Sequence, residues 1–280
     1  MKTYSQFILN EKHTELKYSI FDWDDNILHM DTKIHLKHKV NGFFVDEPVS
    51  TSKYAKIRNL IGNGEWDIDY DKAYVDFRDY GEMGKNAFIN DVKNSIDKKM
   101  YGPSWDSFIN VLVEGNLFGI VTTRGHEPDT LRKGVEYIIY NYLNIEQQNK
   151  MLNNLIKFHY EFNEEFDYLV DDYLNNCYFI GIMSDYFKGK FDFESSKNVE
   201  KAKKIAINYI IREFDKYSDK IGADMTIGFS DDDPGYLNTA KKLFINNKEL
   251  FDNTDFYVFD TSDPHIKGGK KLKIGDNEEL

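Results

Sequence analysis

The stretch of sequence that decides the fold is Tyr18-Ser19-Ile20-Phe21-Asp22-Trp23-Asp24-Asp25-Asn26-Ile27-Leu28, in which an apolar run gives way to acidic residues. The run 18–21 is rich in β-forming residues and predicts a short buried strand. Asp22 and Asp24 would follow the carboxyl end of that strand. In open sheets of parallel strands, ligands bind beyond this end. We therefore expect these carboxylates to belong to a functional site.

Four further apolar runs repeat this pattern along the chain. Helical stretches lie between some of them, an arrangement typical of a parallel sheet with helices on its faces. One predicted helix begins at 127–129, where a proline occupies the first turn, and others are expected from about 198 to 214 and from about 236 to 244. These patterns predict an α/β fold. The four runs are Leu117–Thr122, Tyr178–Met183, Met225–Phe229 and Phe256–Phe259.

A long insertion separates the first two predicted strands. It covers residues 29–114, which is too long for a simple crossover, and it begins with an alternating segment broken by Asn41-Gly42, a strong hairpin signal. Ser50-Thr51-Ser52 offers a helix cap before 53–60. We interpret 29–114 as a cap subdomain, 14–28 together with 115–280 as the core, and 1–13 as a tail. A second excursion, 141–176, is expected to be helical, and the sequence does not indicate its role.

Composition limits the classes of partner. The 280 residues carry a net charge of −12, which disfavours non-specific binding to nucleic acid or an anionic membrane unless a local basic groove is present. The single cysteine, Cys177, excludes an internal disulfide and indicates a reducing, cytoplasmic location. The apolar runs are shorter than the roughly 20 residues needed to cross a bilayer, so no membrane partner is expected. The lysines of 267–273 are interpreted as a solvated tail.

Chemically related side chains follow three of the predicted strands. They are the carboxylates after the first strand, Thr122-Thr123-Arg124-Gly125 after the second, and Ser230-Asp231-Asp232-Asp233 after the fourth. Crowded carboxylates raise one another's pKa unless a cation neutralises them, and oxygen ligands suit Mg²⁺. A carboxylate can also attack a phosphoryl group while a second carboxylate transfers the proton. The sequence therefore predicts Mg²⁺-dependent phosphoryl chemistry.

These motifs resemble those of the haloacid dehalogenase superfamily. Phe21–Leu28 resembles its first motif, Gly119–Gly125 its second and Ile227–Pro234 its fourth. The resemblance implies a Rossmann-like three-layer core and a phosphatase that forms an aspartyl-phosphate. It further implies the following roles: Asp22 as nucleophile, Asp24 as general acid/base, Thr122 as a phosphate ligand with Thr123 and Arg124 as further candidates, and Asp22, Asp231, Asp232 and the backbone carbonyl of Asp24 as Mg²⁺ ligands.

Two positions leave the family pattern open. The motif lysine before the fourth strand could be Lys197, Lys201, Lys203 or Lys204, and we choose Lys201 because it lies four residues before Ile205. Asn26 stands where the family usually has Thr, although an amide can still hydrogen-bond across the loop. The sequence does not indicate the substrate beyond a phosphorylated small molecule or nucleotide.

Three features remain outside this site. His29, His35 and His38 are expected to be surface residues of the hairpin region rather than metal ligands. The opening Met1–Glu11 resembles short capsid-targeting peptides of tailed phages that are cut after a Leu-x-Glu type site, here Leu9-Asn10-Glu11. An amphipathic first turn is an equal alternative. Two other functions therefore stay open: a phage structural or injected protein that uses the fold for binding, located in the virion interior, and a phosphatase of nucleic-acid ends.

Overall fold

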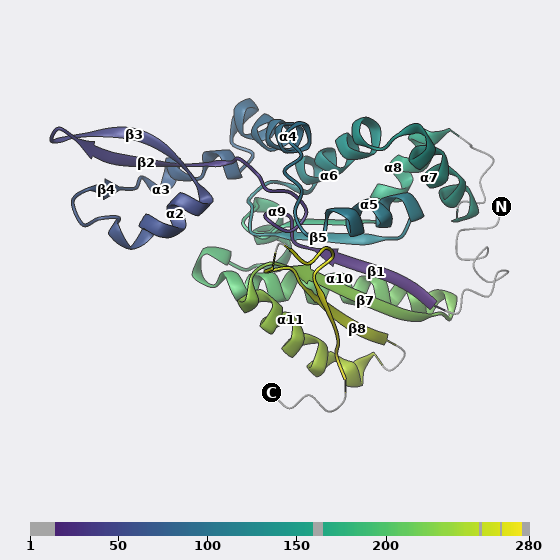
Figure 1. Cartoon of the computed structure of the whole chain (residues 1–280). Coiled ribbons are helices and arrows are strands. Elements are labelled where there is room, and N and C mark those ends of the chain that lie inside the picture. The colour runs from purple at the N-terminus through teal and green to yellow at the C-terminus, as the bar shows by residue number, and fades with distance from the viewer. Residues whose placement is uncertain (1–14, 159–164, 252–253, 264, 276–280) are drawn as a thin grey trace.

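The main feature of the fold is a six-stranded, mostly parallel sheet (Figure 1). The computed structural model describes residues 15–158, 165–251, 254–263 and 265–275. All five predicted strands are present and parallel, which confirms the α/β class and is compatible with a Rossmann-like fold. The strand order is β6 (Tyr178–Gly181), β5 (Phe118–Thr122), β1 (Glu15–Phe21), β7 (Asp224–Asp231), β8 (Thr254–Asp260) and β9 (Lys270–Lys273).

Helices cover both faces of the sheet, because successive side chains of a strand point to opposite faces. In β1, Phe21 packs into one hydrophobic core and Ile20 into the other. The first core is completed by α4 (Gly81–Asp97), α5 (Trp105–Glu114), α6 (Pro128–Tyr137), α7 (Ile145–Phe158) and α8 (Phe166–Asn175). The second is completed by α9 (Asp185–Phe191), α10 (Val199–Ile221) and α11 (Pro234–Asn247). Of the excursion 141–176, the described residues are mostly helical, as predicted, since they form α7 and α8.

Residues 33–77 form a small unit with its own core, which we call the hairpin unit. Its strands β2 (Lys33–Val40) and β3 (Phe43–Ser50) are joined by Asn41 and Gly42, which both have positive φ, as a two-residue hairpin turn requires. Ser50 caps α2 (Thr51–Ile57), as predicted. The unit continues through η1 (Arg58–Leu60), β4 (Trp66–Asp67), α3 (Tyr70–Ala73) and η2 (Val75–Phe77). It extends away from the main sheet (Figure 1).

The predicted insertion 29–114 therefore contains two kinds of structure. Ile34, Leu36 and Val49 of the hairpin unit pack with one another, whereas Phe88 of α4 and Phe108 of α5 pack into the main core beside β1. Two short connections join the hairpin unit to the core: residues 29–32 before β2 and residues 78–80 after η2. Only 33–77 is thus built around a separate core.

The lysine-rich segment is largely exposed, as expected, but residues 270–273 are not a tail. These residues form β9, which pairs antiparallel with β8, and Lys271 packs over the ring of Tyr257 at 4.0 Å. Lysines are common on edge strands because their charge discourages pairing with another chain. The segment Met1–Glu11 lies outside the described residues. Within the described parts of the chain, each helix is too short or too polar to cross a bilayer.

Candidate active site

Three carboxylates meet at the carboxyl edge of the sheet. Asp22 follows β1 and Asp231 ends β7, and these neighbouring strands are held in register, with Phe21 opposite Ser230. The Asp22 backbone N–H donates to the Ser230 carbonyl at 2.9 Å. One carboxylate oxygen each of Asp22, Asp231 and Asp232 lies within 4.8 Å of the others, the one such acidic or metal-ligating group found in the described residues. The predicted acidic site is therefore assembled by strand pairing.

The lysine that contacts this site is Lys203. Its Nζ donates to Asp22 Oδ1 at 2.8 Å and to Asp231 Oδ2 at 2.5 Å, and its side chain is buried. The Nζ also lies 4.0 Å from the centre of the Tyr236 ring. Lys203 thus links the ends of two adjacent strands from a helix that packs across them.

The choice of Lys201 as the motif lysine is wrong, because its side chain does not lie at the carboxylates. Lys201 is exposed and its Nζ lies 5.2 Å from the centre of the Phe193 ring. Lys204 is also exposed, and the side chain of Lys197 is outside those described. Helical spacing was the signal that could have identified Lys203, because it precedes the buried Ala206, Ile207 and Ile210 by three, four and seven residues. These residues share one face of α10, and that face packs on the sheet.

Burial and mutual repulsion act together on the three carboxylates. Burial raises the pKa of Asp22 well above its ordinary value, and the nearby Asp231 and Asp24 add to this effect, while Lys203 opposes it. Burial also raises the pKa of Asp231, again against Lys203. Burial, with Asp231 and Asp25, raises the pKa of Asp232 to about 7. Three carboxylates with one lysine leave a net charge of −2, which a divalent cation would balance. The all-oxygen donor set fits Mg²⁺.

Asn26 holds the loop that carries Asp22. Its side-chain amide donates to the carbonyls of Asp22 at 3.0 Å and Ser230 at 3.1 Å. Its side-chain oxygen accepts from Ser230 Oγ at 2.9 Å and from Thr261 Oγ1 at 2.8 Å. Ser230 Oγ lies 2.6 Å from Ser104 Oγ. The departure from Thr at position 26 is therefore accommodated by a buried network. Ser230 belongs to the cluster that the sequence indicated, whereas Ser104 and Thr261 are members that it did not indicate.

Thr122 and Arg124 lie beside Asp24, whereas Thr123 is exposed. Thr122 is buried, and its Oγ1 donates to Asp24 Oδ2 at 3.3 Å. Arg124 is also buried and forms a bidentate ion pair with Asp24 through Nε and Nη2. Two of the three predicted phosphate ligands, Thr122 and Arg124, thus contact the Asp24 carboxylate.

The neighbouring polar residues have structural roles. Asp233 caps α11 by accepting from the backbone N–H groups of Gly235 and Tyr236. It thus differs from Asp231 and Asp232, which belong to the acidic group. His29 pairs with Asp25, His35 with Asp76 and His38 with Glu47. Each of these histidines is partly exposed and has a carboxylate partner.

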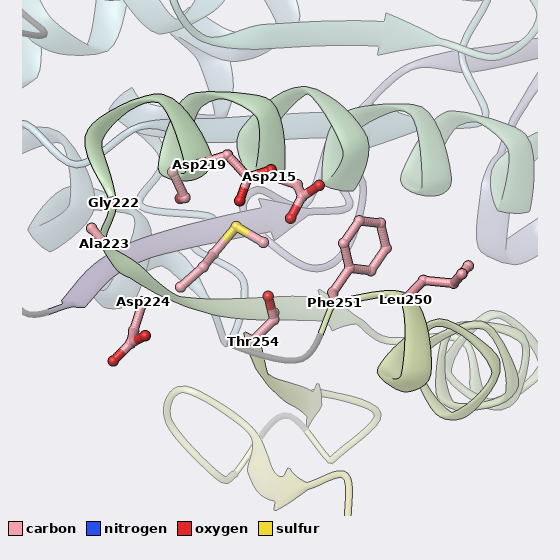
Figure 2. A pocket seen from close by; sticks show the side chains of 10 residues that line it. Asp215, Asp219, Gly222, Ala223, Asp224, Leu250, Phe251 and Thr254 are labelled. Atoms are coloured by element: carbon pink, nitrogen blue, oxygen red, sulfur yellow. The ribbon is translucent and has the colours of Figure 1, made fainter.

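A cavity of about 340 Å³ lies at the opposite, amino-terminal edge of the sheet (Figure 2). It is placed where α10 ends and where β7 and β8 begin, so it is separate from the acidic group. Its lining is partly acidic, and burial and Asp219 raise the pKa of Asp215 there. The lining residues are Asp215, Ser218, Asp219, Gly222, Ala223, Asp224, Met225, Leu250, Phe251 and Thr254.

Comparison of the chain with protein-family models, curated proteins and solved structures finds no match. A functional assignment therefore depends on the residues of the site and on the order of the motifs that supply them.

Proposed function

We propose that this protein is a Mg²⁺-dependent phosphomonoesterase of the haloacid dehalogenase type that acts through an aspartyl-phosphate. The observation that carries the proposal is the group formed by Asp22, Asp231 and Asp232, with the buried Lys203 hydrogen-bonded to the first two. The motifs that supply these residues occur in the order expected for that superfamily. The Rossmann-like architecture agrees with the proposal without requiring it, since one fold can serve many functions.

The first step is assigned to Asp22 and Asp24. Asp24, which is ion-paired in the free protein, takes up a proton when the phosphoester binds. An oxygen of Asp22 then attacks phosphorus, the bond between phosphorus and the ester oxygen breaks, and Asp24 gives this proton to the leaving alcohol. In the second step Asp24 takes a proton from a water molecule, which attacks the phosphorus of the acyl-phosphate. Inorganic phosphate is released and Asp22 is restored, so the side chains end the cycle as they began.

The remaining side chains supply charge and position. Bound Mg²⁺ would offset the negative charge of the phosphoryl group, with Asp22, Asp231, Asp232 and the Asp24 carbonyl as its protein ligands. Lys203 supports Asp22 and adds a positive charge beside it. Thr122 is proposed to donate to a phosphoryl oxygen. The hairpin unit is proposed to act as the cap that selects the leaving group.

Phosphate release from a panel of phosphoesters, measured with and without Mg²⁺, tests the proposal. We expect turnover that requires Mg²⁺ and that falls by roughly 10⁴-fold or more in Asp22→Asn, the scale observed when a nucleophile is removed from other hydrolases. A matched control is Asp25→Asn, because Asp25 is exposed and pairs with His29. Activity that survives Asp22→Asn would contradict the mechanism. A terminally phosphorylated oligonucleotide in the panel tests for action on nucleic-acid ends.

A further inference from the structure

We propose that Arg124 is a positioning residue that fixes the Asp24 carboxylate and joins it to both connections of the hairpin unit. The catalytic part of this inference rests on the proposed function, in which Asp24 transfers protons. It replaces the expectation that Arg124 binds the substrate phosphate. Three sets of contacts support it: those to Asp24, those that enclose the guanidinium, and those to residues 32 and 77.

The contact with Asp24 is bidentate. Arg124 Nε lies 2.9 Å from Asp24 Oδ2, and Nη2 lies 2.6 Å from Asp24 Oδ1. The planar fork of a guanidinium matches a carboxylate in this geometry and fixes its orientation as well as its distance. The side chain of Asp24 is 26% exposed, whereas that of Arg124 is 0% exposed. Asp24 can therefore face a substrate while its partner stays inside the protein.

Aromatic rings enclose the guanidinium. Its central carbon lies 4.9 Å from the centre of the Phe77 ring and 5.4 Å from that of Phe88. Cations over aromatic faces are stabilised, more strongly so when water is excluded. Because the side chain is fully buried, Arg124 could reach a phosphate group only if it left this environment. The guanidinium is thus built into the protein as a support for Asp24.

The same guanidinium contacts a residue at each end of the hairpin unit. Nη2 donates to Thr32 Oγ1 at 2.7 Å, and Thr32 directly precedes β2. Thr32 Oγ1 in turn donates to Asp91 Oδ2 of α4 at 2.5 Å. At the other end, Phe77 directly precedes the connection 78–80, and its carbonyl accepts from the Gly125 backbone N–H at 2.9 Å. Arg78 of that connection forms an isolated β-bridge with Gly125. A displacement of either connection would therefore displace the partner of Asp24.

The activity test uses Thr32→Val, which removes the hydroxyl but keeps the shape of the side chain. We expect kcat to fall roughly 10- to 100-fold, the effect of a small misplacement of a reacting group, while inhibition by orthovanadate, a phosphate mimic, changes less than twofold. Thr32→Ser, which retains the hydroxyl, should restore most of kcat. An unchanged kcat, or an inhibition constant for orthovanadate that rises in parallel with the loss of kcat, would overturn the proposal.

A stability test does not depend on activity. Asp24→Asn removes the charge that pairs with a buried guanidinium, so we expect its Tm to fall by roughly 5 °C or more. Asp25→Asn is the matched control from the same loop, because Asp25 is exposed and pairs with His29 at the surface, so its Tm should stay nearly unchanged. An Asp24→Asn protein as stable as the unaltered protein would overturn the proposal that Arg124 fixes the Asp24 carboxylate. If no phosphoester is hydrolysed at all, the proposed function fails, but the Tm of Asp24→Asn still tests whether Arg124 and Asp24 form a stabilising buried ion pair.

Discussion

Two buried cations contact the acidic residues that follow β1, and they are held in different ways. Lys203 reaches Asp22 and Asp231, which come from adjacent strands. Arg124 gives two of its nitrogens to one carboxylate, that of Asp24, and lies against the Phe77 and Phe88 rings. One cation thus serves a group of crowded carboxylates, while the other holds a single carboxylate in a fixed orientation.

The difference indicates how one loop can carry two carboxylates with distinct roles. An ammonium is a compact point charge that can serve several anions, so Lys203 suits a place where negative charge accumulates. A guanidinium offers a planar fork, so Arg124 suits a place where direction matters. On this view, loss of Lys203 should act mainly on catalysis, and loss of Arg124 should act on stability and on the placement of Asp24.

The largest expected effect is that of Lys203→Met on turnover. Removing the ammonium takes away the charge that opposes crowding between Asp22 and Asp231, and we expect kcat/KM to fall on the order of 10³-fold. Lys201→Met is the matched control from the same helix, and its turnover should stay within about twofold because Lys201 is exposed. Steady-state kinetics on a phosphoester measures both. Equal losses in the two variants would remove the distinction between these lysines.

Arg124→Met should have the next largest effect, on the free energy of unfolding. Breaking a buried ion pair costs about 3–5 kcal/mol, and we expect about 3 kcal/mol because Asp24 is partly open to water. Arg132→Met is the control: Arg132 pairs with Glu136 and Asp171 nearer the surface and should cost about 1 kcal/mol or less. Urea unfolding compares the two. A loss of stability in Arg124→Met no larger than that in Arg132→Met would show that the ion pair between Arg124 and Asp24 does not behave as a buried one.

Asn26→Ala tests the loop between the two cations. It removes the donors to the Asp22 and Ser230 carbonyls and the acceptor for Thr261, and unsatisfied buried groups cost about 1–3 kcal/mol each. We expect a total loss of about 3 kcal/mol, since water can replace part of the network. Asn63→Ala, which removes an exposed amide, should change stability by less than about 0.5 kcal/mol. Similar values for both variants in thermal unfolding would contradict the role of Asn26.

The smallest expected effect is the stabilisation by Mg²⁺ and its dependence on pH. Asp232 has a folded-state pKa of about 7 and an ordinary value of 3.8, so the protonated form favours folding below about pH 4 and that stability is lost as pH rises through 7. Mg²⁺ binds the ionised carboxylates. The Mg²⁺-dependent rise in stability should therefore be larger at pH 8 than at pH 5.5, approaching about 2.7 kcal/mol at 100 times Kd.

Measuring the difference between Mg²⁺ and metal-free samples also removes an opposing contribution. Burial lowers the pKa of His126 to about 3 from 6.5, so His126 makes the folded state less stable as pH falls below about 6.5. This contribution is common to both samples. A rise in Tm with Mg²⁺ that is as large at pH 5.5 as at pH 8 would argue against binding by these carboxylates.

Local patterns predicted most of the fold. The five parallel strands are apolar runs, and the Asn41-Gly42 turn and the Ser50 cap are short-range signals that depend on backbone geometry. β9 was missed because three of its four residues are lysines, and it forms a strand only by pairing with β8. The separate core of the hairpin unit was also hidden, since the sequence does not show that α4 and α5 pack elsewhere.

The sequence predicted those site residues whose position depends only on the end of a strand. It did not predict those whose position depends on how helices and loops pack. Asp22 and Asp231 follow from the carboxyl ends of apolar runs, and the structure brings them together. Lys203 depends on which face of α10 packs on the sheet, which Ile205 alone could not indicate. The partner of Arg124 depends on a fold that brings residues 24, 32 and 124 together, and no local pattern contains that information.

The most direct test of the central claim is to trap the phosphorylated residue. The protein would be mixed with Mg²⁺ and a phosphoester that it hydrolyses, quenched in acid, and treated with borohydride, which reduces an acyl-phosphate to an alcohol. Peptide mass spectrometry would then locate the change. We predict conversion of aspartate to homoserine at position 22 alone, dependent on substrate. Conversion at another carboxylate, or rapid turnover without any conversion, would contradict the assignment of Asp22 as the nucleophile.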